Sequence, residues 1–528
     1  MDPSWTGSDN RGSRQSSRWR PQRYDTCKDL SRDASDLLDP TRHSARDGSM
    51  SNVIPDSSVR TFAGLPRPLY PVTGFTTFDT IAQYCAQALI TYYVYFAVSD
   101  GGLELPPAQS IAIVSAWVAM SLLGTIFTSW LVDRVIGAGI GLRAGALISA
   151  AGYLTLAFAP GPVGLGVGLI LLTLSPALTL VSEGTLTSGV MNGTASRRES
   201  GFTIFYLGSA LGAFVGFTAS GFIQEAWGFQ AGFLVAAAVI LLGFFFYLPF
   251  RRAVEANSPP PPAEERPRGL ALALPIAAAV MATVALSVMV AHGINPSTVI
   301  AVGTGVYVVA ILTRYFTSSA FTARDRKGIV RYLPFFVATV AFNLIFQQIY
   351  TTIAIFSDVR TDRFLFGVEL PPATVVGLAP LCVVVAAPIL AAVWAKLGDR
   401  QPTLSVKFIF TFACCGLAMG LLAASSAQPM TPMLVLAIVV LVFGVADVVV
   451  SPSGMSLATE LAPAGNESRM LSLHYVGISL GISLAGVGGD LFDADDPSVY
   501  FAAFSGLGFV VAAGMLIARL TLGRKVAP

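Results

Sequence analysis

The chain has 528 residues, of which 54% are hydrophobic and only 12% are charged. Soluble domains carry about a quarter charged residues, so this composition excludes an ordinary soluble globular protein. The 33 lysines and arginines nearly balance the 31 aspartates and glutamates, which argues against a nucleic-acid partner because such a partner requires a concentrated basic face. We therefore expect a protein whose apolar surplus faces lipid.

Residues 1–70 contain few large apolar residues and many serines, aspartates and arginines. Such a segment cannot bury enough apolar surface to offset the entropy of ordering, so we predict a disordered cytoplasmic tail. Its arginines could attract anionic lipid, but a solvated tail without function is the simpler interpretation. No signal peptide is expected, because the first apolar run begins only after this tail.

Fourteen later stretches are long and apolar enough to cross a bilayer as helices, which takes about 20 residues each. We predict membrane helices over residues 77–98, 109–132, 142–160, 163–186, 201–223, 228–249, 269–291, 296–317, 330–356, 371–396, 404–424, 432–452, 467–490 and 498–521.

The distribution of basic residues predicts the orientation of these helices. With the amino terminus in the cytoplasm, 31 of the 33 lysines and arginines fall on the cytoplasmic side. The exceptions are Arg360 and Arg363, which lie in an outer loop with acidic neighbours. By the positive-inside rule we place both termini in the cytoplasm of a multi-pass protein of the plasma membrane.

A proline-rich charged segment, residues 251–268, divides the helices and predicts a semi-rigid cytoplasmic linker. We expect six-helix bundles over residues 71–250 and 329–522, an inserted two-helix hairpin over 269–328 and a cytoplasmic carboxyl terminus over 523–528. Two such bundles around a central cavity are a common architecture of secondary transporters, which work by alternating access.

Charged residues recur where the second helix of each bundle ends. Asp133, Arg134 and Arg143 follow one such helix, and Asp399 and Arg400 follow the other. The first set resembles the cytoplasmic loop signature of the major facilitator superfamily. We predict that both sets form a cytoplasmic gate by pairing across helix ends; the alternative is that they only set the topology.

Longer motifs resemble the proton-dependent oligopeptide transporter family within that superfamily. They are RRESGFTIFYLGSALGAF at Arg197–Phe214, scattered matches from Phe346 to Lys407, and ADVVVSPSGMS at Ala446–Ser456. The resemblance covers residues 75 to 520. The count of fourteen helices, with a hairpin inserted between the bundles, is also similar to bacterial members of the family. It implies an all-α polytopic membrane protein with the major facilitator fold.

The chain departs from the family pattern at its cationic positions. The first helix of the family carries Glu-x-x-Glu-Arg-Phe, of which only a shortened acid, Asp79, remains here. Residues 173–185 lack the lysine that the family places on helix four, and Phe346 stands where helix seven carries a glutamate. The predicted lining is therefore acidic and free of cations.

Asp447 aligns with the acid that, in the resembling family, receives the amino group of the substrate. An ionisable residue inside a membrane helix is costly and usually faces a cavity, so we predict that Asp447 binds a substrate ammonium. The alternative is a structural carboxylate bonded to a neighbouring helix.

Four residues are candidates for proton coupling: Asp79, Asp447, Glu183 and His474. A carboxyl group in a poorly solvated cavity favours its neutral form and could carry a proton, and histidine titrates near neutral pH. Alternatives remain: Asp79 could reach water near the cytoplasm, Glu183 could face a loop, and His474 could be a packing residue.

Uncharged polar residues complete the predicted substrate site, where they could bind a peptide backbone by hydrogen bonds or simply join helices. They are Gln87, Tyr84, Asn343, Gln347, Gln348 and Tyr350.

The resemblance implies a proton-coupled symporter of di- and tripeptides or peptide-like amino compounds. A carrier or exporter of another amine-bearing metabolite and a transport-inactive membrane sensor are the alternatives. No metal-binding helix motif or phosphate-binding loop occurs, so we expect neither an enzyme nor a metal site. The expected partners are the substrate and the bilayer, with no obligate protein partner and no cofactor beyond the coupling proton.

Overall fold

The computed structural model describes residues 61–521 apart from 63–64, 192–194, most of 263–293, 320, 366 and 464–465. The side chains of 61–65, 195–200, 365, 399 and 467–468 also lie outside this description. The predicted tail, 1–70, therefore lies almost entirely outside the described residues, as do most of helix 269–291 and the carboxyl terminus 523–528.

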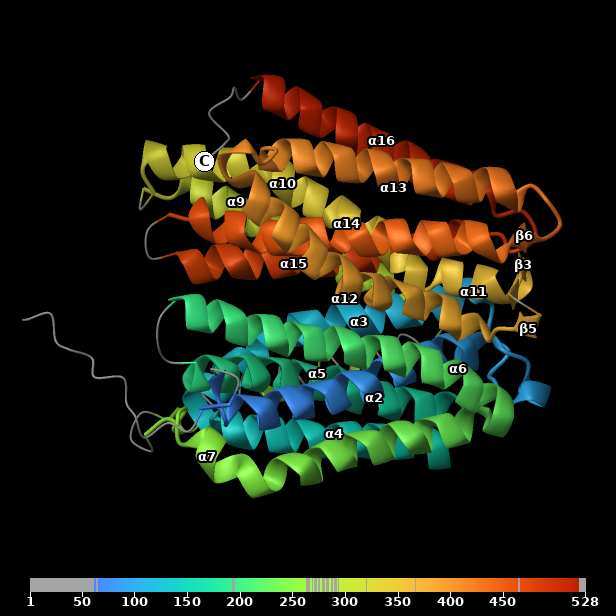
Figure 1. Ribbon diagram of the computed structural model, residues 1–528, viewed down its shortest axis with the longest axis horizontal. Helices are drawn as coiled ribbons and strands as arrows, with labels where there is room; N and C mark the ends of the chain where they lie inside the picture. Colours follow the sequence, from blue (N-terminus) through green and yellow to red (C-terminus); the bar gives the residue numbers. More distant parts are fainter. Residues whose placement is uncertain are drawn as a thin grey trace, which may run out of the picture. The chain divides into compact units, whose positions relative to one another are not determined.

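The first bundle consists of long helices that lie side by side in Figure 1, coloured blue to green. They are α2 (Leu69–Tyr95), α3 (Pro107–Leu131), α4 (Ala138–Phe158), α5 (Pro162–Val190) and α6 (Ala195–Tyr247). Short helical turns follow: η1 (Val98–Asp100), the π-helical η2 (Val132–Ile136), η3 (Leu248–Phe250) and α7 (Arg251–Glu255). Part of the predicted linker is thus helical, and Val254 of α7 is buried.

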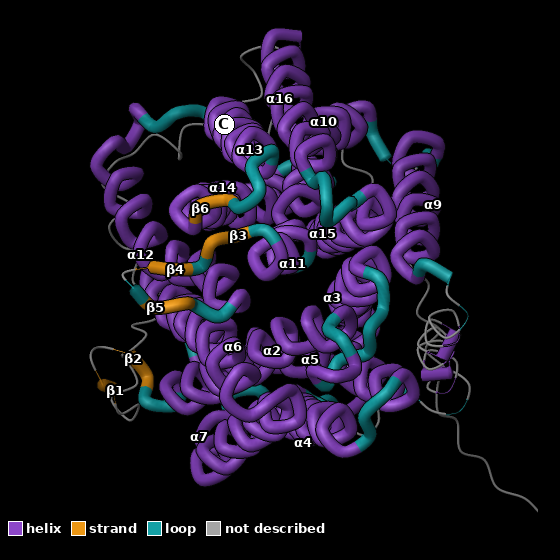
Figure 2. Tube along the Cα trace, turned by 90° about the vertical axis from the view of Figure 1, so that its right-hand side faces the viewer, coloured by secondary structure: helices purple, strands orange, loops and turns teal. Residues whose placement is uncertain are grey.

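The second bundle is coloured yellow to red in Figure 1. Its helices are α10 (Ala323–Phe346), η4 (Gln347–Tyr350), α11 (Thr352–Val359), α12 (Pro372–Leu397), η5 (Gly398–Arg400), α13 (Leu404–Ser426), α14 (Met433–Glu460), α15 (Glu467–Gly488), η6 (Gly489–Leu491) and α16 (Ser498–Thr521). The second hairpin helix, α9 (Pro296–Thr317), lies at the periphery beside α3 and α15 (Figure 2).

Strands are confined to short pairs of two residues each. They are β1 (Thr61–Phe62) with β2 (Leu65–Pro66), β4 (Phe364–Leu365) with β5 (Val368–Glu369), both antiparallel, and β3 (Thr361–Asp362) parallel to β6 (Thr431–Pro432). The last two pairs tie together the loops at one end of the second bundle.

Eleven spans within the described residues are long and apolar enough to cross a membrane. The span Gly201–Glu255 merges two of the predicted helices, and α2 is 27 residues long although it is not among the eleven. The polytopic all-α fold is therefore confirmed. The count of fourteen is consistent with these helices and stays a prediction.

Several helices begin where the sequence supplies the chemistry that helix starts need. Proline is the first residue of α3, α5, α9 and α12, where its missing N–H is not required and its fixed φ suits the helix. Asn295 precedes α9, and its side chain accepts hydrogen bonds from the amides of Ser297 and Thr298.

Two breaks interrupt long helices. Within α6, Gly228 has φ 79° and ψ 177°, and this turn separates the two helices predicted over 201–223 and 228–249. The helix predicted over 330–356 is not continuous, because η4 and Thr351, with φ −125° and ψ −91°, separate α10 from α11. This correction matters because discontinuous membrane helices expose backbone groups and polar side chains at a binding cavity.

Candidate functional site

A cavity of about 350 Å³ lies where the two bundles face each other. This volume is within the range of about 300–1,000 Å³ that is usual for small-molecule sites. Its walls come from α2, α3, α5 and α6 of the first bundle and from α10, η4, α14 and α15 of the second. The predicted site residues that line it are Asp79, Tyr84, Gln87, Glu183, Asn343, Gln347, Tyr350 and Asp447.

The polar side chains of the first bundle reach the cavity because they recur on one helix face. On α2, residues Asp79, Gln83 and Gln87 are spaced four apart and all line the cavity. On α5, Thr179 and Glu183 have the same spacing and also line it. Residues four apart in a helix lie one above the other, so each helix presents a polar stripe within an otherwise apolar surface.

Two carboxyl groups of the first bundle, those of Asp79 and Glu183, are buried close enough to interact electrostatically. Thr179 contacts the carboxyl group of Asp79, and Thr76 contacts that of Glu183. The Oε1 atom of Glu183 is buried without a hydrogen-bond partner in the described part of the protein. The residues around this pair of acids therefore supply only part of the hydrogen bonds that the two carboxyl groups can form.

The third carboxyl group of the cavity, Asp447, comes from the second bundle. It lies on α14 one turn before Ser451, whose Oγ donates a hydrogen bond to Oδ1 of Asp447 at 2.5 Å. Asp447 is only partly buried and lines the cavity, and its second oxygen has no hydrogen-bond partner among the described residues. None of the described residues that line the cavity is lysine, arginine or histidine.

Aromatic and amide side chains form the remaining walls. The ring of Phe217 contacts that of Tyr84 at a centroid distance of 5.1 Å and stacks on that of Tyr350 at 5.3 Å, and the contact with Tyr350 connects the two bundles. Gln347 is buried, and its Nε2 has no hydrogen-bond partner among the described residues. Asn343 donates to the carbonyl oxygen of Thr339 at 2.9 Å, so its side-chain oxygen is left to accept from a ligand.

Two predicted site residues do not line the cavity. The Oε1 atom of Gln348 accepts hydrogen bonds from Thr352 and from Tyr500 of α16, at 2.5 and 2.8 Å. The Nδ1 atom of His474 lies 3.0 Å from the hydroxyl of Tyr332 within the second bundle. These positions favour the alternatives that Gln348 and His474 are packing residues.

In the first set of predicted gate residues, Arg143 forms an ion pair, whereas Asp133 and Arg134 form none within the described part of the chain. Arg143 pairs with Glu255 of α7 at 3.5 Å and also donates to the carbonyl oxygen of Gly139. Asp133 and Arg134 are exposed, and within the described part of the chain no ion pair joins Asp133 to either arginine. Arg400 is exposed and the side chain of Asp399 lies outside the described residues, so the gate role of this second set stays a prediction.

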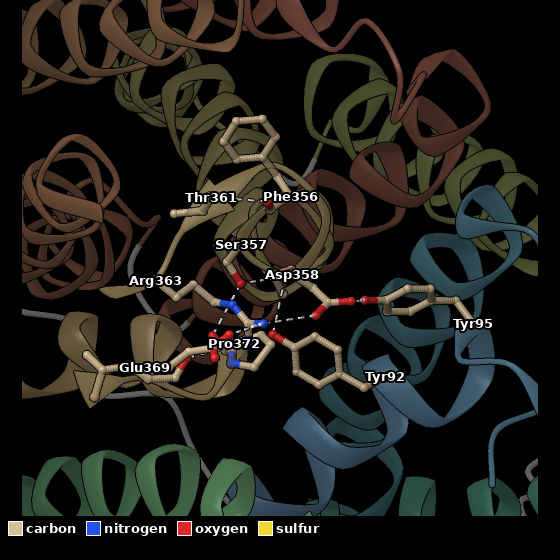
Figure 3. Close-up of polar contacts among 11 residues, drawn as sticks. Tyr92, Tyr95, Phe356, Ser357, Asp358, Thr361, Arg363, Glu369 and Pro372 are labelled. Atoms are coloured by element: carbon tan, nitrogen blue, oxygen red, sulfur yellow. Dashed lines mark hydrogen bonds and ion pairs between the residues drawn. The ribbon is translucent and has the colours of Figure 1, made fainter. Parts of the chain in front are cut away.

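Contacts between the bundles cluster at the end of α2 that the charge pattern places outside the cell, hereafter the outer end. Thr91 and Tyr92 donate hydrogen bonds to the carbonyl oxygens of Tyr350 and Ala354, at 3.3 and 3.2 Å. One turn further, the hydroxyl of Tyr95 donates to Asp358 (Figure 3). Since these residues follow Gln87 along α2, they join the two bundles between the cavity and the outer end of α2.

Arginine completes this outer contact. The Nη2 atom of Arg363 lies 4.0 Å from Asp358 and 3.2 Å from Glu369, so Asp358 is held by a tyrosine of the first bundle and an arginine of its own (Figure 3). Sequence reasoning noted the arginine and its acidic neighbours but not their partner Tyr95. It also missed Gln83, Trp117, Ser121 and Thr179 as lining residues, which the four-residue polar spacing on α2 and α5 could have indicated in part.

Two bundles of membrane helices around a central polar cavity define a transporter of the major facilitator fold. The sequence profile of the POT family matches residues 143–487, about two thirds of the chain. The protein therefore belongs to the POT family.

Similar proteins extend this match over most of the chain. An uncharacterised transporter of Bacillus subtilis, YclF, is 27% identical over 86% of this chain and 94% of its own length. A di-/tripeptide transporter of Lactococcus lactis subsp. cremoris is also 27% identical, over 87% of this chain and 96% of its own. The crystal structure of a peptide transporter POT with sulfate is 26% identical, with a TM-score of 0.82, and covers 89% of this chain and 97% of its own.

Proposed function

We propose that the protein is a proton-coupled symporter of di- and tripeptides or peptide-like amino compounds. The observation that carries this proposal is the cavity between the bundles, with Asp447 on one side and the pair of Asp79 and Glu183 on the other. The similarity to a di-/tripeptide transporter and to a peptide transporter of known structure supports the peptide class.

In this proposal Asp447 binds the amino group of the substrate. Ser451 occupies one carboxylate oxygen of Asp447 and holds the side chain in place, while the other oxygen accepts from the ligand ammonium. Gln347, Gln87 and Asn343 supply amide donors and acceptors for a peptide backbone. The unpartnered Nε2 of Gln347 is the clearest of these, because a buried amide without a partner is costly.

Asp79 and Glu183 carry the coupling proton. Two buried carboxyl groups repel each other when both are charged, so the pair retains one proton when the cavity is closed to water. Exposure of the pair to the cytoplasm releases that proton, which makes the transport cycle sensitive to the proton gradient.

During the transport cycle the outer contacts between Tyr95, Asp358 and Arg363 break when the cavity opens on that side, and they form again when it closes. The described conformation is the one in which the outer side of the cavity is closed. We place the protein in the plasma membrane with both termini in the cytoplasm, and we assign it neither a protein partner nor any cofactor other than the proton.

Uptake by purified protein in proteoliposomes tests this function. A mixed pool of di- and tripeptides is offered with and without an inward proton gradient, to the wild type, to Asp447→Ala and to the control Glu460→Ala. Glu460 is an exposed carboxylate at the far end of α14 and does not line the cavity. Gradient-driven uptake by wild type and control, lost in Asp447→Ala, supports the proposal.

The same experiment separates the alternatives. Peptide uptake that ignores the gradient contradicts proton coupling and favours a facilitator. Absence of peptide uptake under every gradient contradicts the peptide class; flux of another amine would then indicate a changed substrate, and absence of any flux would indicate a sensor.

A further inference from the structure

The carboxyl groups of the cavity are divided between the two bundles. Asp447 stands on α14, whereas Asp79 and Glu183 stand on α2 and α5. A ligand held between the bundles therefore meets negative charge on both sides. A substrate with a single ammonium group can neutralise only one of them.

In the first bundle, one oxygen of the two buried carboxyl groups lacks a hydrogen-bond partner among the described residues. Oε1 of Glu183 is buried and unbonded among the described residues, and Glu183 is only 2% exposed. Leaving such an atom without a donor is costly, so it is suited to receive a donor from the ligand. This atom marks a second ammonium position, separate from that at Asp447.

A free ligand carboxylate has no counterpart here. The cavity lining that the structure describes contains no basic residue. Arg143 pairs with Glu255, and Arg363 pairs with Glu369 and Asp358 in the outer contact. The unpartnered Nε2 of Gln347 can donate to a neutral carbonyl oxygen but adds no positive charge.

The aromatic walls suit the same type of ligand. Trp117, Phe205 and Phe346 line the cavity together with Tyr84 and Tyr350. Aromatic faces attract ammonium groups and pack against the methylene groups of a basic side chain. Their ring faces carry a negative quadrupole and do not attract a carboxylate.

We propose that this cavity selects substrates with two positive charges and no free carboxylate, such as an amidated dipeptide with a lysine side chain. One ammonium group binds Asp447 and the other binds the pair of Asp79 and Glu183. This inference rests on the proposed function, because it names the substrate class of the same cavity. A pair that retains one proton carries one negative charge, so the dication balances the pair and Asp447.

A charge series of dipeptides tests the inference on the full-length wild-type protein. Ala-Ala is a zwitterion, Ala-Ala-amide carries one positive charge, and Lys-Ala-amide carries two. Each competes for uptake in proteoliposomes and is also measured by thermal stabilisation of the purified protein. Lys-Ala-amide should bind about tenfold or more tighter than Ala-Ala-amide, since pairing of a desolvated charge exceeds the free energy of one decade in affinity.

Variants locate the two charges. Asp79→Asn combined with Glu183→Gln removes the negative charge of the pair and should lower the affinity for Lys-Ala-amide far more than the affinity for Ala-Ala-amide. Asp447→Asn should weaken both ligands, and Glu460→Gln, outside the cavity, should weaken neither. If a variant does not fold, the affinities of the wild-type protein for the three dipeptides decide whether the inference holds.

The outcomes distinguish this inference from the proposed function. Gradient-driven uptake in which Ala-Ala equals or exceeds Lys-Ala-amide overturns the inference and leaves peptide symport standing. Binding of Lys-Ala-amide with the expected variant pattern but without uptake supports the inference and contradicts symport. Sodium ions that raise the thermal stability of the protein as much as Lys-Ala-amide does would overturn the inference. Absence of binding by all three dipeptides would overturn it as well.

Discussion

At the scale of single residues, Asp447 offers a clean separation between binding and stability. In Asp447→Asn the side chain keeps its volume and can still accept the hydrogen bond from Ser451. It loses the charge that pairs with an ammonium group, so we expect a loss of about 2–5 kcal/mol in substrate binding. Competition against a labelled substrate measures this loss.

The matched change for this prediction is Ser451→Ala, which keeps the charge and removes the hydroxyl that orients it. We expect a smaller loss, of about 0.5–1.5 kcal/mol, because only one hydrogen bond disappears. A larger effect in Ser451→Ala than in Asp447→Asn would contradict direct binding by the carboxylate.

The packing of His474 against α14 requires a residue without a side chain at Gly454. A Cβ atom at this position of α14 would lie 2.6 Å from Cε1 of His474, closer than packed atoms tolerate. Gly454→Ala should therefore destabilise the protein by about 1–3 kcal/mol. Thermal unfolding in detergent measures the effect.

The second-site change His474→Ala provides the control for Gly454→Ala. It removes the clashing ring, so in the double variant Gly454→Ala should cost much less than it does alone. Since His474 lies outside the cavity, the pH dependence of uptake should survive in His474→Gln. A lost pH dependence would restore His474 as a proton site.

The candidate acids could be found in the sequence because a charged residue inside an apolar helix stands out, and Asp79, Glu183 and Asp447 all line the cavity. That Asp79 and Glu183 lie close enough to interact electrostatically could not be predicted, because it depends on how α2 packs against α5. The same limit explains Gln348: one residue beyond Gln347, it points away from the cavity to Tyr500.

At the scale of elements, two glycines separate backbone strain from helix propensity. Gly228 has a positive φ of 79°, and a Cβ there would meet nothing within 4 Å. Gly228→Ala should destabilise the protein by about 1–3 kcal/mol, because an L-residue is strained in that conformation.

Gly506 is the matched control, because it lies inside α16 with ordinary helical geometry and equally open space. Gly506→Ala should stabilise the protein by up to about 1 kcal/mol, as alanine is the better helix former. Thermal unfolding of both variants gives the comparison. Equal signs for the two changes would contradict this account of the break in α6.

The two helix breaks also show which part of the fold a sequence can reveal. Two separate apolar stretches, 201–223 and 228–249, predicted two helices, and the break at Gly228 separates them. At Thr351 no glycine or proline marks the interruption between α10 and α11, so the sequence predicted a continuous helix over 330–356. Tertiary contacts, such as the hydrogen bond from Thr91 to the carbonyl oxygen of Tyr350, accompany that break instead.

At the scale of the whole transporter, alternation requires contacts that hold one side closed without holding it permanently. Tyr95, Asp358 and Arg363 meet this requirement, because their polar groups can find water when they separate (Figure 3). A closure made only of packed apolar side chains would expose hydrophobic surface on opening. The outer contact is therefore suited to a reversible role.

Asp358→Asn should shift this balance toward a conformation that is open on the outer side. The change weakens the contact with Tyr95 and Arg363 by about 1.5–3 kcal/mol, enough for roughly a tenfold or larger rise in the outward-open population.

Spin labels at the exposed residues Val98 and Val368, on the outer ends of the two bundles, report the distance between them. A longer distance should gain population in the variant relative to Asp362→Asn, an exposed neighbour without an ion pair to Arg363 among the described residues. Identical distance distributions in the two variants would show that the contact at Asp358 does not hold the outer side closed.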